Sequence, residues 1–331
     1  MSFKEAIQRA IERKKLELEQ REMAFTEDFE AGEKILFTGL DNSGKSSIIL
    51  SLQSKYSKIA TLQPTRQTER TSFAYLGNRI TRWDMGGQQR YRISYLQNPG
   101  KYFDRTAICI FVVDVQDTER IDEALEYYQS VLGTFNQLNI SPPIYVFLHK
   151  ADPEWMQSTE DYQASYVDSL ENRFRDATGE NFQLFFQITS IFDPWTVISS
   201  FSEVLLHLYP KSELVDRSIQ EFARKLEADG MVVLDNNALI LGQYYKQFEE
   251  KLNFESILPY VLQLWENFRT VQRKVEKMAL KVDDVEYMFR SVTDPSQTEE
   301  RYVFVKAPFG GINDDDFTEF GNILVDLLSR K

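Results

Sequence analysis

The stretch Gly39-Leu-Asp-Asn-Ser-Gly44-Lys45-Ser46 decides the fold. It fits the pattern G-x-x-x-x-G-K-S/T, in which glycines let the backbone wrap closely round phosphate groups. An apolar run, Ile35-Leu-Phe37, precedes it, and a helical stretch follows it as far as Leu52. Because the first turn of a helix leaves backbone N–H groups unpaired, this order of strand, loop and helix predicts a phosphate-binding loop.

The residues of this loop have distinct expected contacts. We expect Lys45 to reach the β- and γ-phosphates of a nucleotide, and the Ser46 hydroxyl to bind Mg²⁺. The remaining loop residues expected to contact the nucleotide are Gly39, Asp41, Asn42, Ser43, Gly44 and Ser47. The alternative is a chance turn between a strand and a helix, and the motifs downstream argue against it.

A second motif, Trp83-Asp84-Met-Gly-Gly87-Gln88, follows a predicted β-hairpin. Asp84 ends a strand and is placed to bind the magnesium shell. Gly87 offers a backbone N–H to a γ-phosphate, and the Gln88 amide can orient the attacking water. An Asp-x-x-Gly pattern alone is common, but its position after a phosphate loop and a hairpin makes it specific.

Thr65 is our candidate for the threonine that closes a switch loop on Mg²⁺ and the γ-phosphate. It follows Pro64 directly. Three nearby threonines, Thr61, Thr68 and Thr71, compete for this role, and the sequence leaves the choice among them open.

A third motif, His149-Lys150-Ala-Asp152, follows the apolar run Ile144–Leu148. A carboxylate at the end of that strand can accept both N1–H and N2–H₂ of guanine, a pair of donors that adenine does not offer. Lys150 can lay its aliphatic stem along the base. His149 is either part of this site or a structural histidine, and the sequence leaves both possibilities open.

The segment Thr189-Ser190-Ile191 follows the next apolar run, Leu184–Ile188. Because the carboxyl ends of parallel strands meet at one edge of a sheet, we expect it beside Asp152. There a backbone N–H of Ser190 or Ile191 can bond the base oxygen. The three motifs together therefore predict a guanine-nucleotide site.

The order of predicted elements indicates two domains. Between residues 32 and 211, strands such as Ile108–Val113 alternate with helices, which predicts an α/β domain with a mostly parallel sheet. Residues 212–331 predict a separate antiparallel α+β domain, and residues 1–31 a charged N-terminal helical extension. The elements expected in the second domain are helices at about 212–228, 254–278 and 315–329, and strands at 231–234, 238–241, 282–292 and 302–306.

Composition excludes several classes of protein. The 331 residues carry a net charge of −13, which argues against nucleic acid as a general partner. The single cysteine, Cys109, rules out a disulfide framework and is expected to be a buried apolar side chain in a reducing, cytoplasmic compartment. Ser2 and a charged N-terminus give no lipidation signal, signal peptide or direct membrane anchor, so recruitment to a membrane surface would need a partner.

Together these motifs resemble the Ras superfamily of small GTPases. The phosphate loop, Pro64-Thr65 and Trp83–Gln88 are similar to the Arf branch, whereas His149–Asp152 and Thr189–Ile191 are similar to the Rag/Gtr branch. The resemblance implies GTP and GDP as ligands with Mg²⁺, and slow hydrolysis in which Gln88 and Lys45 are catalytic. It also implies a roadblock (longin-like) C-terminal domain that forms a homo- or heterodimer, and GTPase-activating and exchange partners.

Two departures from these families stand out. The Arf pattern has an N-terminal glycine that this chain lacks, and His149 stands where most GTPases have asparagine, which predicts weaker guanine affinity. Three alternatives remain open from the residues: a non-catalytic GTP- or GDP-bound scaffold, a P-loop small-molecule kinase, and a monomeric chain whose C-terminal domain is a sensor. The kinase alternative is disfavoured because Asp152 would have no role in such an enzyme.

Overall fold

The computed structural model describes residues 32–52, 65, 68–75, 78–157, 160–209, 212–271, 276–292, 301–310 and 314–329. The expected N-terminal helix and the residues Thr61 and Pro64 lie outside this part of the chain. In the described part no helix is long and apolar enough to cross a membrane.

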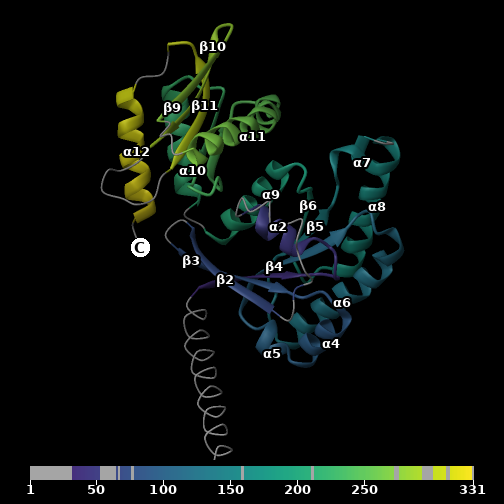
Figure 1. Ribbon diagram of the computed structural model, residues 1–331. Helices are drawn as coiled ribbons and strands as arrows, with labels where there is room; N and C mark the ends of the chain where they lie inside the picture. The colour runs from purple at the N-terminus through teal and green to yellow at the C-terminus, as the bar shows by residue number, and fades with distance from the viewer. Residues whose placement is uncertain are drawn as a thin grey trace, which may run out of the picture.

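The first half of the structure is built on a six-stranded sheet in the order β2-β3-β1-β4-β5-β6 (Figure 1). The hairpin β2–β3 is antiparallel, and every other neighbouring pair is parallel. The strands are β1 (Glu33–Thr38), β2 (Thr68–Tyr75), β3 (Asn78–Met85), β4 (Thr106–Asp114), β5 (Ile144–His149) and β6 (Leu184–Thr189). The predicted α/β class with a mostly parallel sheet is confirmed.

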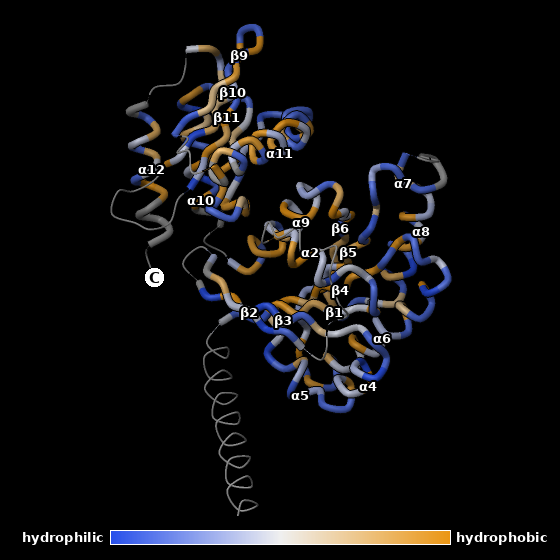
Figure 2. Tube along the Cα trace, viewed as in Figure 1, coloured by the Kyte–Doolittle hydropathy of each residue, from blue (hydrophilic) through white to orange (hydrophobic). Residues whose placement is uncertain are grey.

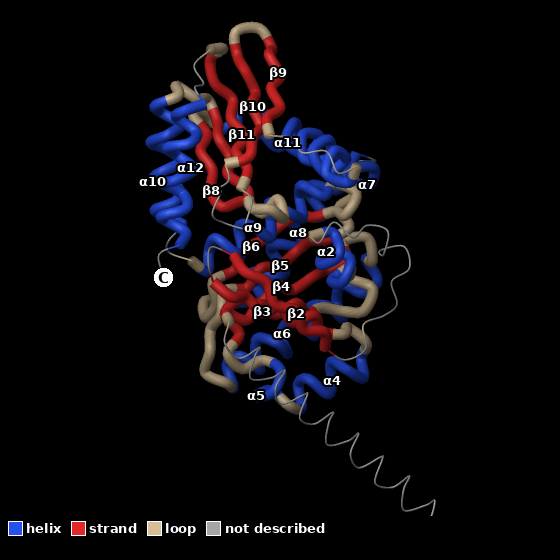
Figure 3. The backbone as a smooth tube through the Cα atoms, turned by 60° about the vertical axis from the view of Figure 1, so that its left-hand side comes forward, coloured by secondary structure: helices blue, strands red, loops and turns tan. Residues whose placement is uncertain are grey.

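Helices cover both faces of this sheet (Figure 3). One face packs against α2 (Lys45–Ser51) and α9 (Pro194–Leu208). The other packs against α4 (Gln89–Gln97), α6 (Ile121–Gln137) and α8 (Glu160–Thr178). The short helices are α5 (Pro99–Tyr102), η1 (Thr118–Arg120) and α7 (Pro153–Gln157).

The central strands are apolar throughout because both of their faces are covered. In β4, Ile110 and Val112 lie in the core beneath α2 and α9, whereas Cys109 and Phe111 lie in the core beneath α6. Burial raises the pKa of the Cys109 thiol well above its ordinary value, as expected for an inert apolar side chain. The loops that follow the parallel strands β1, β3, β4, β5 and β6 share one edge, which is where α/β sheets bind ligands.

The second half is an α+β domain around its own five-stranded antiparallel sheet in the order β8-β7-β11-β10-β9. The strands are β7 (Gly230–Leu234), β8 (Ile240–Tyr245), β9 (Lys277–Val282), β10 (Val285–Ser291) and β11 (Tyr302–Pro308). The helices are α10 (Ser212–Lys225), α11 (Phe248–Thr270) and α12 (Asp314–Ser329). The predicted class of this domain is confirmed.

The expected boundaries of the long helix are wrong. The sequence predicts a helix over residues 254–278, but α11 begins at Phe248, and Lys277 already belongs to β9. Glu249 and Glu250 stabilise the earlier start because acidic side chains favour the positive end of the helix dipole. The end is set by tertiary pairing, since Met278 lies opposite Phe289 of β10.

Helix α9 joins the two sheets. Phe201 and Val204 of α9 lie in a core that runs from β1 and β4 into the C-terminal domain, and α9 is largely hydrophobic in Figure 2. Two buried hydrogen bonds add to this contact. The Tyr75 hydroxyl donates to the Ile240 carbonyl at 2.5 Å, and the Ile240 N–H donates to Ser202 Oγ at 2.9 Å. The described parts of the two sheets therefore share one continuous hydrophobic core.

Candidate functional site

The phosphate loop connects β1 to α2 and has an unusual backbone. Gly39, Asn42 and Gly44 have φ values of +140°, +61° and +94°, in the region that favours glycine. A Cβ atom on Gly39 would come within 2.4 Å of the Val112 carbonyl oxygen. Both glycines of the sequence motif are therefore required by conformation and by space, since a Cβ atom on Gly44 would meet the His149 ring.

Lys45 is buried at the floor of this loop. Its ammonium donates to the Leu40 carbonyl at 2.6 Å, and to the Gly39 carbonyl and Ser43 Oγ at 3.3 Å each. Burial lowers the pKa of Lys45 to about 8, against the opposing effect of the nearby carboxylates of Asp84 and Asp41. A buried ammonium bonded mainly to neutral carbonyls is a ready partner for an anion such as a phosphate.

Three oxygen-bearing side chains meet beside Lys45. Ser46 Oγ lies 2.6 Å from Asp84 Oδ2 and 2.7 Å from Thr65 Oγ1. The other carboxylate oxygen, Asp84 Oδ1, is buried without a hydrogen-bond partner among the described residues. Burial raises the pKa of Asp84, although Lys45 and the Ser46 hydroxyl oppose that rise. Thr61 lies outside the described residues; of the three candidate threonines within them, Thr65 is the one whose hydroxyl joins this cluster.

This donor set fits Mg²⁺, which prefers hard oxygen ligands and keeps several waters, so one carboxylate and two hydroxyls suffice. The described residues contain no group of three or more His, Cys, Asp and Glu side chains that could hold a metal. That observation excludes an all-protein carboxylate or histidine cage in this part of the chain. It does not conflict with a magnesium site made by Ser46, Thr65 and Asp84, because such a site needs only one carboxylate.

The segment Gly87-Gln88 lies against the phosphate loop. A Cβ atom on Gly87 would come within 2.2 Å of the Asp41 nitrogen, so any larger residue would displace one of the two segments. Gln88 is half-buried at the N-cap of α4, where its side chain makes no capping hydrogen bond. Gly87 therefore lies directly against the Leu40–Asp41 backbone of the phosphate loop, and Gln88 follows it.

Asp152 is held by two side chains at the same sheet edge. Ser190 Oγ donates to Asp152 Oδ1 at 2.5 Å, and the Gln116 amide donates to Oδ2 at 3.0 Å. The Gln116 amide also donates to the Lys150 carbonyl at 2.7 Å. The sequence analysis missed Gln116; the signal available was its position just beyond the carboxyl end of β4.

Lys150 has a φ of +63°, and its ammonium lies 2.6 Å from Asp114 Oδ2. This ion pair orients the stem that the sequence assigns to the base. In the neighbouring loop the Ser190 N–H is bonded to Thr196 Oγ1 at 3.0 Å, so Ile191 is the better candidate for donating an amide to the base oxygen.

His149 lies in the interior between the phosphate and base loops. Its Nδ1 is 2.9 Å from Thr189 Oγ1, and a Cβ atom on Gly44 would come within 2.3 Å of its ring. Burial lowers the pKa of His149 to about 3, and the Lys150 charge adds to that effect, so the ring is neutral at ordinary pH. His149 therefore packs between the two loops, against Gly44 on one side and Thr189 on the other.

Fold and site together define the class as a P-loop small GTPase. Residues 34–261, more than half of the chain, match the family model described as "Gtr1/RagA G protein conserved region". The chain therefore belongs to the Gtr1/RagA family of G proteins.

Relatives agree with this assignment. The chain is 24% identical to the Ras-related GTP-binding protein A of Dictyostelium discoideum over 75% of this chain and 82% of that protein. It is 23% identical to the Ras-related GTP-binding protein B of Rattus norvegicus over 73% of this chain and 67% of that protein.

Arf-like proteins match a shorter stretch. The ADP-ribosylation factor-like protein 3 of Chlamydomonas reinhardtii is 34% identical over 36% of this chain and 63% of that protein. The solved structure of the Arl6 (BBS3) small GTPase of Trypanosoma brucei, with a bound GppNp nucleotide analogue, is 22% identical over 54% of this chain and 97% of that chain, with a TM-score of 0.42.

Proposed function

We propose that this chain binds GTP and GDP with Mg²⁺ at the edge described above and slowly hydrolyses GTP, acting as a nucleotide-dependent switch. The observation that carries the proposal is the hydrogen-bonded Asp152 carboxylate on the same edge as the buried Lys45 ammonium. These groups suit the two ends of a guanine nucleotide, and family membership supports the same ligand. In this role Asp152 accepts from the base, Ile191 donates to its oxygen, and the Lys150 stem lies along it.

At the phosphate end, Lys45 and the amides of the loop would bind the β- and γ-phosphates. Ser46, Thr65 and Asp84 would hold Mg²⁺, which neutralises phosphate charge when it is bound. Gly87 would donate its N–H to the γ-phosphate, and the Gln88 amide would orient the water for in-line attack. Loss of the γ-phosphate would release the segments that carry Thr65 and Gly87, which is the switch.

We propose further that the chain works as a dimer, with itself or with a second member of its family, through the C-terminal domain. Apolar side chains are exposed there on α11, just after its end and on the edge strand β9: Tyr260, Leu264, Phe268, Val271, Leu280 and Val282. Covering such a surface on a partner would remove it from water. A cytoplasmic location, activating and exchange partners, and recruitment to a membrane surface through a partner belong to the same proposal.

Single-turnover hydrolysis of GTP by the full chain tests the catalytic part. Gln88→Leu, which keeps the side chain's size but not its amide, is expected to slow hydrolysis by roughly 10²-fold while GTP still binds. Gln89→Leu, at an exposed position next along the chain, is the matched control. Equal rates for wild type and Gln88→Leu would instead favour a non-catalytic, nucleotide-bound scaffold.

A further inference from the structure

The phosphate loop contains an acidic residue, Asp41, although the ligand expected there is itself negatively charged. Asp41 lies within the loop, and its backbone nitrogen is in contact with Gly87, beside Gln88. The Asp41 carboxylate is also close enough to Lys45 to favour its charged form, so a terminal phosphate bound by Lys45 and Gly87 would lie near that carboxylate. Like charges at close range repel each other, so an uncompensated carboxylate at this position would disfavour the triphosphate.

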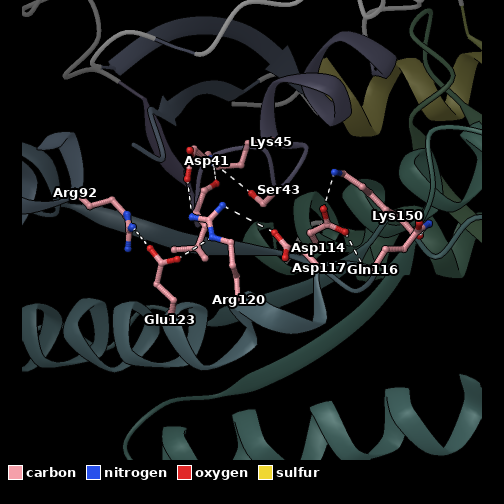
Figure 4. Close-up of polar contacts among 11 residues, drawn as sticks. Asp41, Ser43, Lys45, Arg92, Asp114, Gln116, Asp117, Arg120, Glu123 and Lys150 are labelled. Carbon is pink, nitrogen blue, oxygen red and sulfur yellow. Dashed lines mark hydrogen bonds and ion pairs between the residues drawn. The ribbon is translucent and has the colours of Figure 1, made fainter. Parts of the chain in front are cut away.

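The structure supplies compensation from a distant part of the chain. The Arg120 guanidinium, on η1, donates to Asp41 Oδ1 at 2.7 Å (Figure 4). It also donates to Glu123 Oε2 at 2.8 Å, and its Nη1 lies 3.9 Å from Asp117 Oδ2. The hydrogen bonds that Arg120 donates to Glu123 and Asp41 raise the pKa of Arg120 further above its already high value, so its charge is permanent.

Glu123 extends the network to the helix that follows Gln88. Its second oxygen accepts from Arg92 of α4, whose side chain is nearly buried. The hydrogen bond from Arg120 is the chief reason that the pKa of Glu123 is lowered, so this acid stays ionised and bridges the two arginines. Asp41, Arg120, Glu123 and Arg92 thus form one alternating chain of charges from the phosphate loop to α4.

As an addition that rests on the proposed function, we propose that Arg120 is a positioning residue for the terminal phosphate of a nucleoside triphosphate. It holds the Asp41 carboxylate toward η1 and neutralises it, so that the loop accepts a triphosphate as readily as a diphosphate. Arg120 acts through Asp41 and need not touch the nucleotide. Its removal should therefore weaken the triphosphate selectively, because the diphosphate ends farther from Asp41.

The test is a comparison of two affinities in the full chain with Mg²⁺: for GDP and for the non-hydrolysable analogue GppNp. Arg120→Gln is expected to lower the ratio of GppNp to GDP affinity roughly tenfold, the size of one charge-assisted hydrogen bond. Adding Asp41→Asn to Arg120→Gln removes the acid and should return the ratio to within about twofold of wild type, since the repulsion is gone.

Arg173→Gln is the matched control, because Arg173 of α8 forms an ion pair with Asp122 of α6, next to Glu123 in the chain but not one of the four charged residues of the network. It should change neither affinity. If Arg120→Gln does not fold, Asp41→Asn and Asp41→Asn/Arg120→Gln are compared instead, and the proposal expects the same ratio for both.

A purely structural role for Arg120 gives a different pattern. Equal loss of GppNp and GDP in Arg120→Gln, no rescue by Asp41→Asn, or a tenfold difference between the two Asp41→Asn variants would each overturn the inference alone. Failure of the wild-type chain to bind either guanine nucleotide would overturn the proposed function and this inference with it.

Discussion

The two sheets of this protein differ in the side chains that lie around them: buried and polar at one edge of the parallel sheet, exposed and apolar around the antiparallel sheet. At the carboxyl edge of the parallel sheet, polar groups such as Lys45, Asp84 and His149 are buried, and burial shifts the pKa of each. Around the antiparallel sheet the notable side chains are apolar and exposed, as Leu264 on α11 and Leu280 on β9 show. Buried charge needs a ligand or an ion partner, whereas exposed apolar surface needs another surface. The contrast supports the proposal that the first domain binds a nucleotide and that the second binds a partner chain.

The largest effect is expected at the polar edge. Asp152→Asn replaces an acceptor of two guanine donors and should weaken GDP binding by roughly 10²- to 10³-fold, about 3–4 kcal/mol. Xanthine nucleotides should gain affinity, because the asparagine NH₂ can donate to the oxygen that replaces the guanine amino group. Titration with fluorescent GDP and XDP measures both changes, and Glu154→Gln, at an exposed position on α7, is the control. Unchanged GDP affinity would place the base elsewhere.

At the exposed apolar surface of α11 and β9, a charged substitution should weaken dimer formation. Leu264→Asp is expected to weaken dimer formation by about 10- to 100-fold, because it puts a charge into a surface that the partner would cover. Light scattering of the purified assembly over a range of concentrations measures this, with the exposed neighbour Gln263→Asp as the control. If Leu264→Asp associates as tightly as wild type, this surface is not the interface.

A smaller effect concerns the protonation of Lys45. In the free protein the pKa of Lys45 is lowered to about 8, whereas bound phosphates would raise it because they stabilise the ammonium. Binding therefore takes up a proton above pH 8, and nucleotide affinity should be about tenfold lower at pH 9 than at pH 7. Lys45→Arg stays charged over this range, so its affinity, though lower at pH 7, should not fall further. A wild-type affinity that is flat across this range would contradict the assignment.

The smallest effect lies where the two regions meet. Tyr75→Phe removes a buried hydrogen bond to the Ile240 carbonyl and should lower the free energy of unfolding by about 1–2 kcal/mol. The neighbouring Tyr209→Phe is the control, because the Tyr209 hydroxyl is buried without a hydrogen-bond partner among the described residues. Denaturant unfolding should give one transition in both variants, since the sheets share a core. Two separate transitions would show that the domains unfold independently.

The parts of the fold and site that depend on short stretches of sequence could be predicted from local patterns. The phosphate loop and the strand ends that bear Asp84 and Asp152 follow from apolar runs and glycine spacing. Gln116 and Arg120 could not be found that way, because their partners lie 36 and 79 residues away and no periodicity links them. The end of α11 was misplaced for the same reason, since pairing of β9 with β10 decides it. Ion pairs and strand pairs between residues far apart in the chain could therefore not be predicted from this sequence alone.

The central claim is that the polar edge holds a guanine nucleotide. The most direct test is to denature the full-length protein, purified without added nucleotide, and identify what it releases by chromatography and mass spectrometry. Wild type and the Glu154→Gln control are expected to release GDP or GTP with little adenine nucleotide, and Asp152→Asn is expected to release much less guanine nucleotide. Release of ATP or ADP in place of guanine nucleotides would contradict it.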